Sequence, residues 1–301
     1  MYRNVLIPVD GSTFSEHAVP YAGAIARRAQ ARLHVVLVHT PLASHSAAIV
    51  PTRVFDEWED EYREKEAHYL DALVQGLCKQ GIDAVAETLD GDVADRLIQR
   101  AKSEADLLVM ATHGRGGLEQ AWLGSVADAV VHHVRLPVLL VRPQEDANLP
   151  EDPVFEHLLV ATDGSQAADA ATDQAVQIAG LFDARLTLLR VVSVPAGLSS
   201  PYLPHAARMD RETTERRQEE AQRFLDEKAA QLGSDARVQT RVALAYHPAR
   251  AILESIAELE CDLIVLGTHR RARLARIVLG SVADKVVRAS PVPVLIGHTD
   301  G

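Results

Sequence analysis

The sequence of 301 residues is poor in cysteine, in aromatic side chains and in long apolar runs. Its two cysteines, Cys78 and Cys261, are too few for a disulfide framework. We therefore expect no disulfide and a reducing, cytoplasmic location. No apolar run approaches the ~18 residues that cross a bilayer. The first residues lead directly into a strand-like run, so we expect neither a membrane span nor a secretory signal.

Positive charge is also in deficit, with 31 Lys and Arg against 42 Asp and Glu and a net charge of −11. An acidic chain repels a phosphate backbone, so general nucleic-acid binding is disfavoured. The basic residues of 270–276 are a local exception. They form either a solvated surface or an anion site.

Several motifs of nucleotide and metal chemistry are missing. No Gly-Lys-Ser/Thr follows a glycine run, and no dinucleotide fingerprint follows the first apolar run. His132 and His133 are adjacent on a predicted helix and face different ways, so we expect no metal pair there. No Ser-His-Asp arrangement emerges. Asp128 and Asp284, in the first turns of predicted helices, are expected to complement the helix dipole.

What the chain does contain is a repeat of about 150 residues. Leu-Gly-Ser-Val-Ala-Asp occurs at 123–128 and again at 279–284, and Ile-Pro-Val-Asp-Gly-Ser at 7–12 resembles 160–165. Two domains are predicted, residues 1–145 and 154–301. A linker rich in proline and acidic residues joins them across 142–153.

Within each half, short β-branched runs alternate with helical periodicity, which predicts an open parallel sheet with helices on both faces. Residues 40–55 and 193–210 are expected to be irregular, and 56–66 to form a solvated helix face. The predicted strands are 5–9, 33–38, 85–88, 107–110 and 138–141, then 158–161, 186–191, 238–243, 263–266 and 294–296. The predicted helices are 13–28, 56–79, 93–103 and 126–133, then 168–181, 212–231, 249–257 and 282–288.

Ligands of open α/β sheets bind beyond the carboxyl ends of the strands. Asp10 follows the first predicted strand, and a glycine-containing loop, 111–117, follows the fourth. Gly124-Ser125 then opens a helix whose amides and dipole favour a phosphate. The alternative is that the glycines form a plain loop and that Ser125 is only an N-cap.

Together these residues resemble the universal stress protein family in its tandem two-domain form. The family's adenine-nucleotide signature is Gly, two residues, Gly, nine residues, then Gly-Ser or Gly-Thr. The first half matches with Ala111, Gly114 and Gly124-Ser125, and the second with Gly267, Arg270 and Gly280-Ser281. The resemblance covers nearly the whole chain.

The resemblance implies, for each half, a five-stranded parallel sheet of order 3-2-1-4-5. It also implies that strands 138–141 and 294–296 meet in an internal pseudo-dimer, and that two chains form a homodimer. It implies an ATP site, with or without Mg²⁺, in each half. For the first half the implied residues are Pro8, Asp10, Val38, Met110, Ala111, Thr112, His113, Gly114, Arg115, Gly124, Ser125, Val126 and Ala127. For the second half they are Asp163, Val191, Gly267, Thr268, His269, Arg270, Gly280, Ser281 and Val282.

Both halves depart from the signature. Ala111 adds a methyl group that is tolerable if its φ is negative. Arg270 replaces a glycine that can adopt positive φ, so its side chain either obstructs the site or donates to phosphate.

Three functions are consistent with this sequence. The first is an adenine-nucleotide sensor or regulator of the stress response that acts through an unknown regulatory protein partner. The second is a slow ATPase, although no metal-holding acid cluster or poised base is evident. The third is an interaction module without nucleotide.

Overall fold

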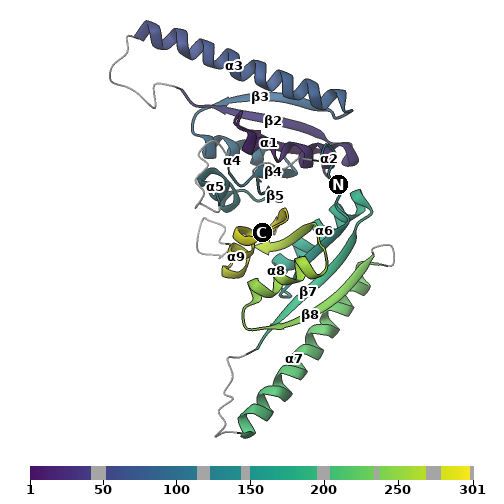
Figure 1. The fold of residues 1–301 in the computed structure, drawn as a ribbon. Helices are drawn as coiled ribbons and strands as arrows, with labels where there is room; N and C mark the ends of the chain where they lie inside the picture. Colours follow the sequence, from purple (N-terminus) through teal and green to yellow (C-terminus); the bar gives the residue numbers. More distant parts are fainter. Residues whose placement is uncertain are drawn as a thin grey trace. The chain divides into compact units, whose positions relative to one another are not determined.

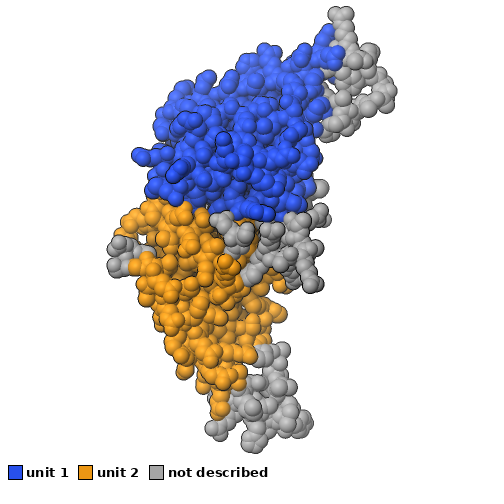
Figure 2. Space-filling model, turned by 180° about the vertical axis from the view of Figure 1, so that it is seen from behind, with its two compact units in different colours: residues 1–154 blue, residues 155–301 orange. Residues whose placement is uncertain are grey.

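The computed structural model describes residues 1–41, 52–113, 123–143, 150–194, 204–233, 237–268 and 279–298. The chain divides into two compact units, Met1–Val154 and Phe155–Gly301, which Figure 2 colours separately. Within the described ranges, no helix combines the length and the apolar character that a bilayer span requires.

Unit 1 is a parallel sheet with helices on both faces (Figure 1). Its strands lie in the order β3-β2-β1-β4-β5, and each neighbouring pair is parallel. The chain moves outward to β3 and then returns to β4. Right-handed crossovers therefore place α2 and α3 on one face and α4 and α5 on the other. The elements are β1 (Asn4–Val9), α1 (Thr13–Glu16), α2 (Val19–Ala29), β2 (Arg32–His39), α3 (Thr52–Lys79), β3 (Ala84–Asp90), α4 (Val93–Glu104), β4 (Leu107–Ala111), α5 (Ser125–His133) and β5 (Val138–Val141).

Unit 2 repeats this architecture with strand order β8-β7-β6-β9-β10, again with parallel neighbours. The predicted α/β fold, with order 3-2-1-4-5 in each half, is confirmed. The elements are β6 (His157–Ala161), α6 (Gln166–Phe182), β7 (Arg185–Ser193), α7 (Pro204–Gln231), β8 (Val238–Ala245), α8 (Pro248–Glu258), β9 (Leu263–Thr268), α9 (Ser281–Ala289) and β10 (Val294–His298).

The central strands are buried because helices cover both of their faces. Every residue of β4 is buried, and the outer strand β3 instead alternates between more buried and more exposed positions. Continuous apolar sequence is typical of buried parallel strands. This burial fixes the strand ends firmly, and the candidate site lies at those ends.

The first helix of unit 1 differs from the prediction of one helix over 13–28. It is broken, because α1 ends at Glu16 and α2 begins at Val19. Pro20 has no N–H to donate to the Glu16 carbonyl, so an unbroken helix would lose that hydrogen bond. Unit 2 has Asp173 at the matching position, inside the continuous helix α6.

The predicted irregular segments are shorter than expected. Helix α3 already begins at Thr52 and α7 at Pro204. Once a long helix is nucleated, each added residue costs little, so a weakly periodic first turn can join it. Pro204 also suits the start of a helix, where its missing N–H is no loss.

Candidate functional site

The candidate site of unit 1 lies where the connections of two adjacent strands diverge. β1 pairs with β4, but the chain leaves β1 toward α1 and leaves β4 toward α5 on the other face. Such a switch point opens a crevice at the carboxyl edge of a parallel sheet. β6 and β9 form the equivalent point in unit 2.

A hydrogen-bonded turn holds Asp10 at the end of β1. Its Oδ1 accepts from the Ser12 backbone N–H at 2.9 Å and from the Ser12 hydroxyl at 2.6 Å. Ser12 is the N-cap of α1, and its hydroxyl accepts from the Ser15 N–H at 3.2 Å. The Asp10 N–H in turn donates to Ser15 Oγ at 3.2 Å. The sequence reasoning missed Ser15, although Asp-x-Ser with a following serine is a signal for such a turn.

The neighbouring strand β2 brings Val38 to the same edge, half-buried and in register with Leu89 of β3. The next residue, His39, is fully buried between two carboxylates. Its Nδ1 lies 2.6 Å from Glu66 Oε2 and its Nε2 lies 2.5 Å from Glu59 Oε1. The prediction that 56–66 is a solvated face is therefore wrong for Glu66, which is buried because it binds His39. These bonds fix α3 to the end of β2.

Thr112 and His113 follow β4 and are coupled to each other. Thr112 is buried, its N–H donates to the Val141 carbonyl at 2.9 Å, and its Oγ1 lies 3.0 Å from His113 Nδ1. Burial, and then the Arg142 charge, lower the pKa of His113, which favours the neutral imidazole. Met110 and Ala111 just before them are also buried.

Gly124 connects the start of α5 directly to the end of β4. Its N–H donates to the Thr112 carbonyl at 2.7 Å. A Cβ at Gly124 would lie 3.0 Å from that carbonyl oxygen, a tight contact. The glycine is thus explained by a close approach of two backbone segments, and its φ of −62° is open to any residue.

The alternative in which Ser125 is the N-cap is wrong. Gly124 is the N-cap, Ser125 is the first helical residue, and the N-cap has no side chain that could make a capping hydrogen bond. Ser125 is exposed, Val126 is half-buried and Ala127 is buried. The first-turn amides of an α-helix have no partner within the helix, so this terminus suits an anion.

In unit 2 the turn after β6 repeats the Asp-to-Ser hydrogen bond and the glycine with positive φ, but it has different neighbours. Asp163 is exposed, and its Oδ1 accepts from the Ser165 N–H at 2.9 Å. Gly164 has φ of +82°, and a Cβ there would lie 3.4 Å from the Phe224 ring. Arg190 stacks on that ring, with its guanidinium carbon 4.6 Å from the ring centroid. An aromatic side chain from α7 and a cation from β7 therefore flank the turn.

Gly267, at the end of β9, matches the signature because a helix lies against it. A Cβ there would lie 2.4 Å from the Ala167 carbonyl oxygen, at the start of α6. Neither Gly267 nor Ala111 has positive φ, so the condition stated for Ala111 is met. Val191, half-buried in β7, pairs with Ala243 and takes the place of Val38.

The threonine of unit 2 has a different histidine partner. Thr268 Oγ1 lies 3.0 Å from Nδ1 of His298, at the end of β10. His298 is 8% exposed, and burial lowers its pKa to about 4. Gly280 is the N-cap of α9, again without a side-chain bond. Among the residues described here, no hydrogen bond joins Gly280 to Thr268, and a Cβ on Gly280 would meet no atom within 4 Å.

The structure thus brings most of the expected residues to the two carboxyl edges. Ser281 and Val282 lie in the first turn of α9, and Pro8 pairs with Val36 near the end of β1. Four expected residues lie outside the described ranges, as does the basic cluster: Gly114, Arg115, His269, Arg270 and the rest of 270–276.

Other chemistry has less support. In the described part of the chain, no three His, Cys, Asp or Glu side chains are placed to hold a metal ion. Asp128 and Asp284 lie in the first turns of α5 and α9, as expected of dipole partners. Both cysteines are free thiols, and burial raises the pKa of Cys261 to about 12, so the unreactive thiol form prevails. The two edges therefore offer backbone donors, hydroxyls and one carboxylate each.

Comparison with known proteins gives one consistent result. A model of the universal stress protein family matches residues 1–142 and again 155–298. A universal stress protein of Mycobacterium tuberculosis strain H37Rv is 28% identical over 304 residues, covering 98% of this chain and 97% of the relative. One from Methanocaldococcus jannaschii is 32% identical over 146 residues, covering 47% of this chain and 83% of its own length.

Solved structures agree on the fold. The crystal structure of a universal stress protein from Archaeoglobus fulgidus matches with a TM-score of 0.70 at 22% identity, over 98% of this chain and 96% of that one. A putative universal stress protein from Pseudomonas aeruginosa matches with a TM-score of 0.65 at 17% identity, over 99% and 94%. At these identities the likeness is one of fold.

Proposed function

Because the chain belongs to the universal stress protein family, we propose that it binds an adenine nucleotide, ATP with or without Mg²⁺, and acts as a sensor or regulator in the stress response. One observation carries the proposal. At the switch point of unit 1, the Gly124 N–H donates to the Thr112 carbonyl just after β4 at 2.7 Å, and α5 starts there at a glycine, which has no capping side chain. The helix therefore presents its positive end at the place where α/β sheets bind ligands.

The proposed pose places the triphosphate at the first turn of α5 and the base near Asp10 and Val38. A carboxylate oxygen accepts more than one hydrogen bond, so Asp10 can hold its turn and also accept the adenine amino proton. Guanine has a carbonyl oxygen in place of that amino group, and a carboxylate repels it. Asp10 therefore gives unit 1 a preference for adenine.

The direct test is to denature purified protein and identify any released nucleotide by mass spectrometry, then to titrate emptied protein with ATP and GTP. Asp10→Asn keeps an oxygen for the Ser12 N–H, so the turn should persist while ATP loses its advantage over GTP. The matched control, Ser12→Ala, removes hydroxyl bonds of the turn and leaves the carboxylate, so ATP preference should remain. If Asp10→Asn discriminates as the parent does, the base lies elsewhere. Single-turnover assays with ATP distinguish a sensor from a slow ATPase.

Assembly is a separate proposal, taken from the family. Strands 138–141 and 294–296 pair within the chain, and two chains associate through further contacts, since open strand edges are prone to pairing. Sedimentation velocity tests this. A monomer whose two units tumble independently would contradict both parts.

A further inference from the structure

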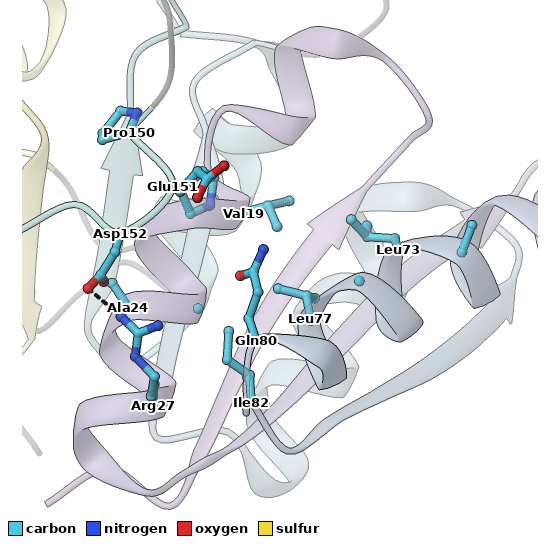
Figure 3. Close-up of a pocket in the computed structure, with 14 residues that line it drawn as sticks. Val19, Ala24, Arg27, Leu73, Leu77, Gln80, Ile82, Pro150, Glu151 and Asp152 are labelled. Atoms are coloured by element: carbon cyan, nitrogen blue, oxygen red, sulfur yellow. Dashed lines mark ion pairs between the residues drawn. The ribbon is translucent and has the colours of Figure 1, made fainter.

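Unit 1 contains a cavity that takes no part in the candidate nucleotide site. It lies between α2 and α3, has a volume of about 300 Å³, and is closed on a third side by residues 150–152 (Figure 3). Its walls are mostly apolar, with Val19 on α2 and Leu73 and Leu77 on α3. Pockets for small molecules begin at about this size and have such walls.

One glycine from each helix lines the cavity, and the two glycines have different roles. Gly76 lies in the last turn of α3, and a Cβ there would meet no atom within 4 Å. Glycine is less favourable than alanine in a helix, and packing does not require it at this position. Gly23 of α2 differs, since a Cβ there would lie 2.9 Å from Ile82 Cδ1. Gly23 thus allows close packing at the base of the cavity, whereas Gly76 leaves space.

The third wall is held by ion pairs. Asp152 accepts two hydrogen bonds from Arg28, at 2.7 and 3.1 Å, and also pairs with Arg27. Glu151 lines the cavity beside it, so two acidic and two basic side chains balance at this mouth. Figure 3 shows the Gln80 side chain extending between the two helices toward the middle of the space. The mouth therefore carries no net charge and offers an amide for hydrogen bonding.

We propose that this cavity binds a small, uncharged, largely apolar molecule with one hydrogen-bonding group, such as an aromatic amine. Apolar walls favour the body of such a molecule, and Gln80 provides its hydrogen-bond partner. The cavity runs along α2 from Val19 to Arg27 and ends near Gln80. None of the residues that line it is among the expected nucleotide residues, so the two sites are separate.

The first experiment titrates the full chain with N-phenyl-1-naphthylamine, a neutral fluorescent probe with one N–H. We expect saturable binding of one probe per chain. Gly76→Leu adds a side chain at a position that lines the cavity and whose Cβ would meet no atom within 4 Å, so it should weaken binding at least tenfold. The matched control is Gly180→Leu in α6, another last-turn glycine whose Cβ would meet no atom within 4 Å; it should leave binding unchanged. Unaltered binding by Gly76→Leu, or no saturable binding by the parent, would overturn the proposal.

A second experiment tests the charge of the mouth. The sulfonated relative 8-anilinonaphthalene-1-sulfonate has nearly the same rings and one negative charge, so the parent should bind it several-fold more weakly than the neutral probe. In Asp152→Asn the positive charges of Arg27 and Arg28 exceed the remaining negative charge at the mouth. The affinity for the anionic probe should then rise. Asp183→Asn, which removes an exposed ion pair with Arg237 within unit 2, should change the affinity for neither probe. If Asp152→Asn leaves the ratio of the two affinities as in the parent, this mouth is not where the probes bind.

Discussion

The two units share a topology but place their first helix on the sheet differently. In unit 2, α6 lies so close to β9 and β10 that only glycine fits at 267 and 297. Unit 1 has Ala111 and Val141 at the matching positions, and its first helix is broken. In unit 1, the side chains of Ala111 and Val141 therefore occur together with a broken first helix, next to the candidate site. The same fold can thus support two differently shaped sites.

The two units also differ at the start of the helix where the phosphates are proposed to bind. Unit 1 ties the start of its fourth crossover helix to the preceding strand through Gly124 and Thr112, and among the described residues unit 2 has no equivalent bond. Unit 1 thus holds its helix terminus more firmly. A preorganised donor group binds better, so we expect unit 1 to bind ATP more tightly than unit 2.

The largest expected effect comes from breaking the close packing of unit 2 with Gly267→Ala. The new Cβ would lie 2.4 Å from the Ala167 carbonyl oxygen, and backbone there cannot easily yield. We expect unit 2 to lose about 3 kcal/mol of unfolding free energy. Urea unfolding can separate the units, because both tryptophans, Trp58 and Trp122, are in unit 1. The circular dichroism transition of unit 2 should move to lower urea while the fluorescence transition stays.

Gly180→Ala is the control for this change. It places a methyl group in open space on the same helix, so unit 2 should keep its stability or gain up to about 1 kcal/mol. If Gly267→Ala behaves like Gly180→Ala, α6 is free to move away and the close packing is not a constraint.

A second large effect concerns acid and His298. Its pKa is about 4 when buried, against an ordinary value of 6.5, so folded unit 2 binds fewer protons than the unfolded chain between these values. The contribution of neutral His298 to the stability of unit 2 is therefore fully present above about pH 6.5 and is lost as the pH falls toward 4. The gap corresponds to roughly 3 kcal/mol. Unit 2 of His298→Asn, which keeps a polar atom for Thr268, should lose less stability than the parent between pH 7.5 and 4.5.

The matching change in unit 1 is His113→Asn. Burial and Arg142 lower the pKa of His113, so the sign is the same, and the effect should appear in the tryptophan transition instead. Identical acid sensitivity of the parent and His298→Asn in the circular dichroism transition would show that this histidine does not couple folding to protons.

The strand order and the expected site residues followed from the resemblance to the family. The sequence itself predicted only a parallel sheet with helices on both faces, because its strand and helix patterns are local. It could not predict that Glu66 is buried, since its partner His39 is far away in sequence and the helix face looks solvated. Nor could the sequence show whether a glycine is needed for a positive φ or for a close approach of backbone. Gly267 and Gly124 avoid a clash with distant backbone, and only the packed structure shows that backbone.

A smaller effect sharpens the contrast at the helix starts. Gly124→Ala and Gly280→Ala make the same change at an N-cap, where alanine is disfavoured. Only the first adds a contact at 3.0 Å, with the Thr112 carbonyl oxygen. We expect Gly124→Ala to cost its unit about 1 kcal/mol more than Gly280→Ala costs the other, and to weaken ATP binding in unit 1. Denaturation and calorimetric titration of both variants measure this, and equal losses would mean that the Gly124 contact relaxes freely.

The smallest expected effect on stability is that of Pro20→Ala, which asks what breaks the first helix of unit 1. The new N–H stabilises the fold only if it donates to Glu16, whereas alanine frees the unfolded chain in either case. If the helix stays broken, we expect a loss of about 0.5 kcal/mol in the tryptophan transition. The informative measurement is hydrogen exchange at the new backbone amide of this variant. α1 contacts β4, and Ala111 of β4 and Val141 of the adjacent β5 carry side chains that unit 2 lacks. A continuous path like that of α6 therefore stays obstructed, and the amide should exchange quickly. A protected amide would show instead that Pro20 alone causes the break, and that the side chains of the strands merely accompany it.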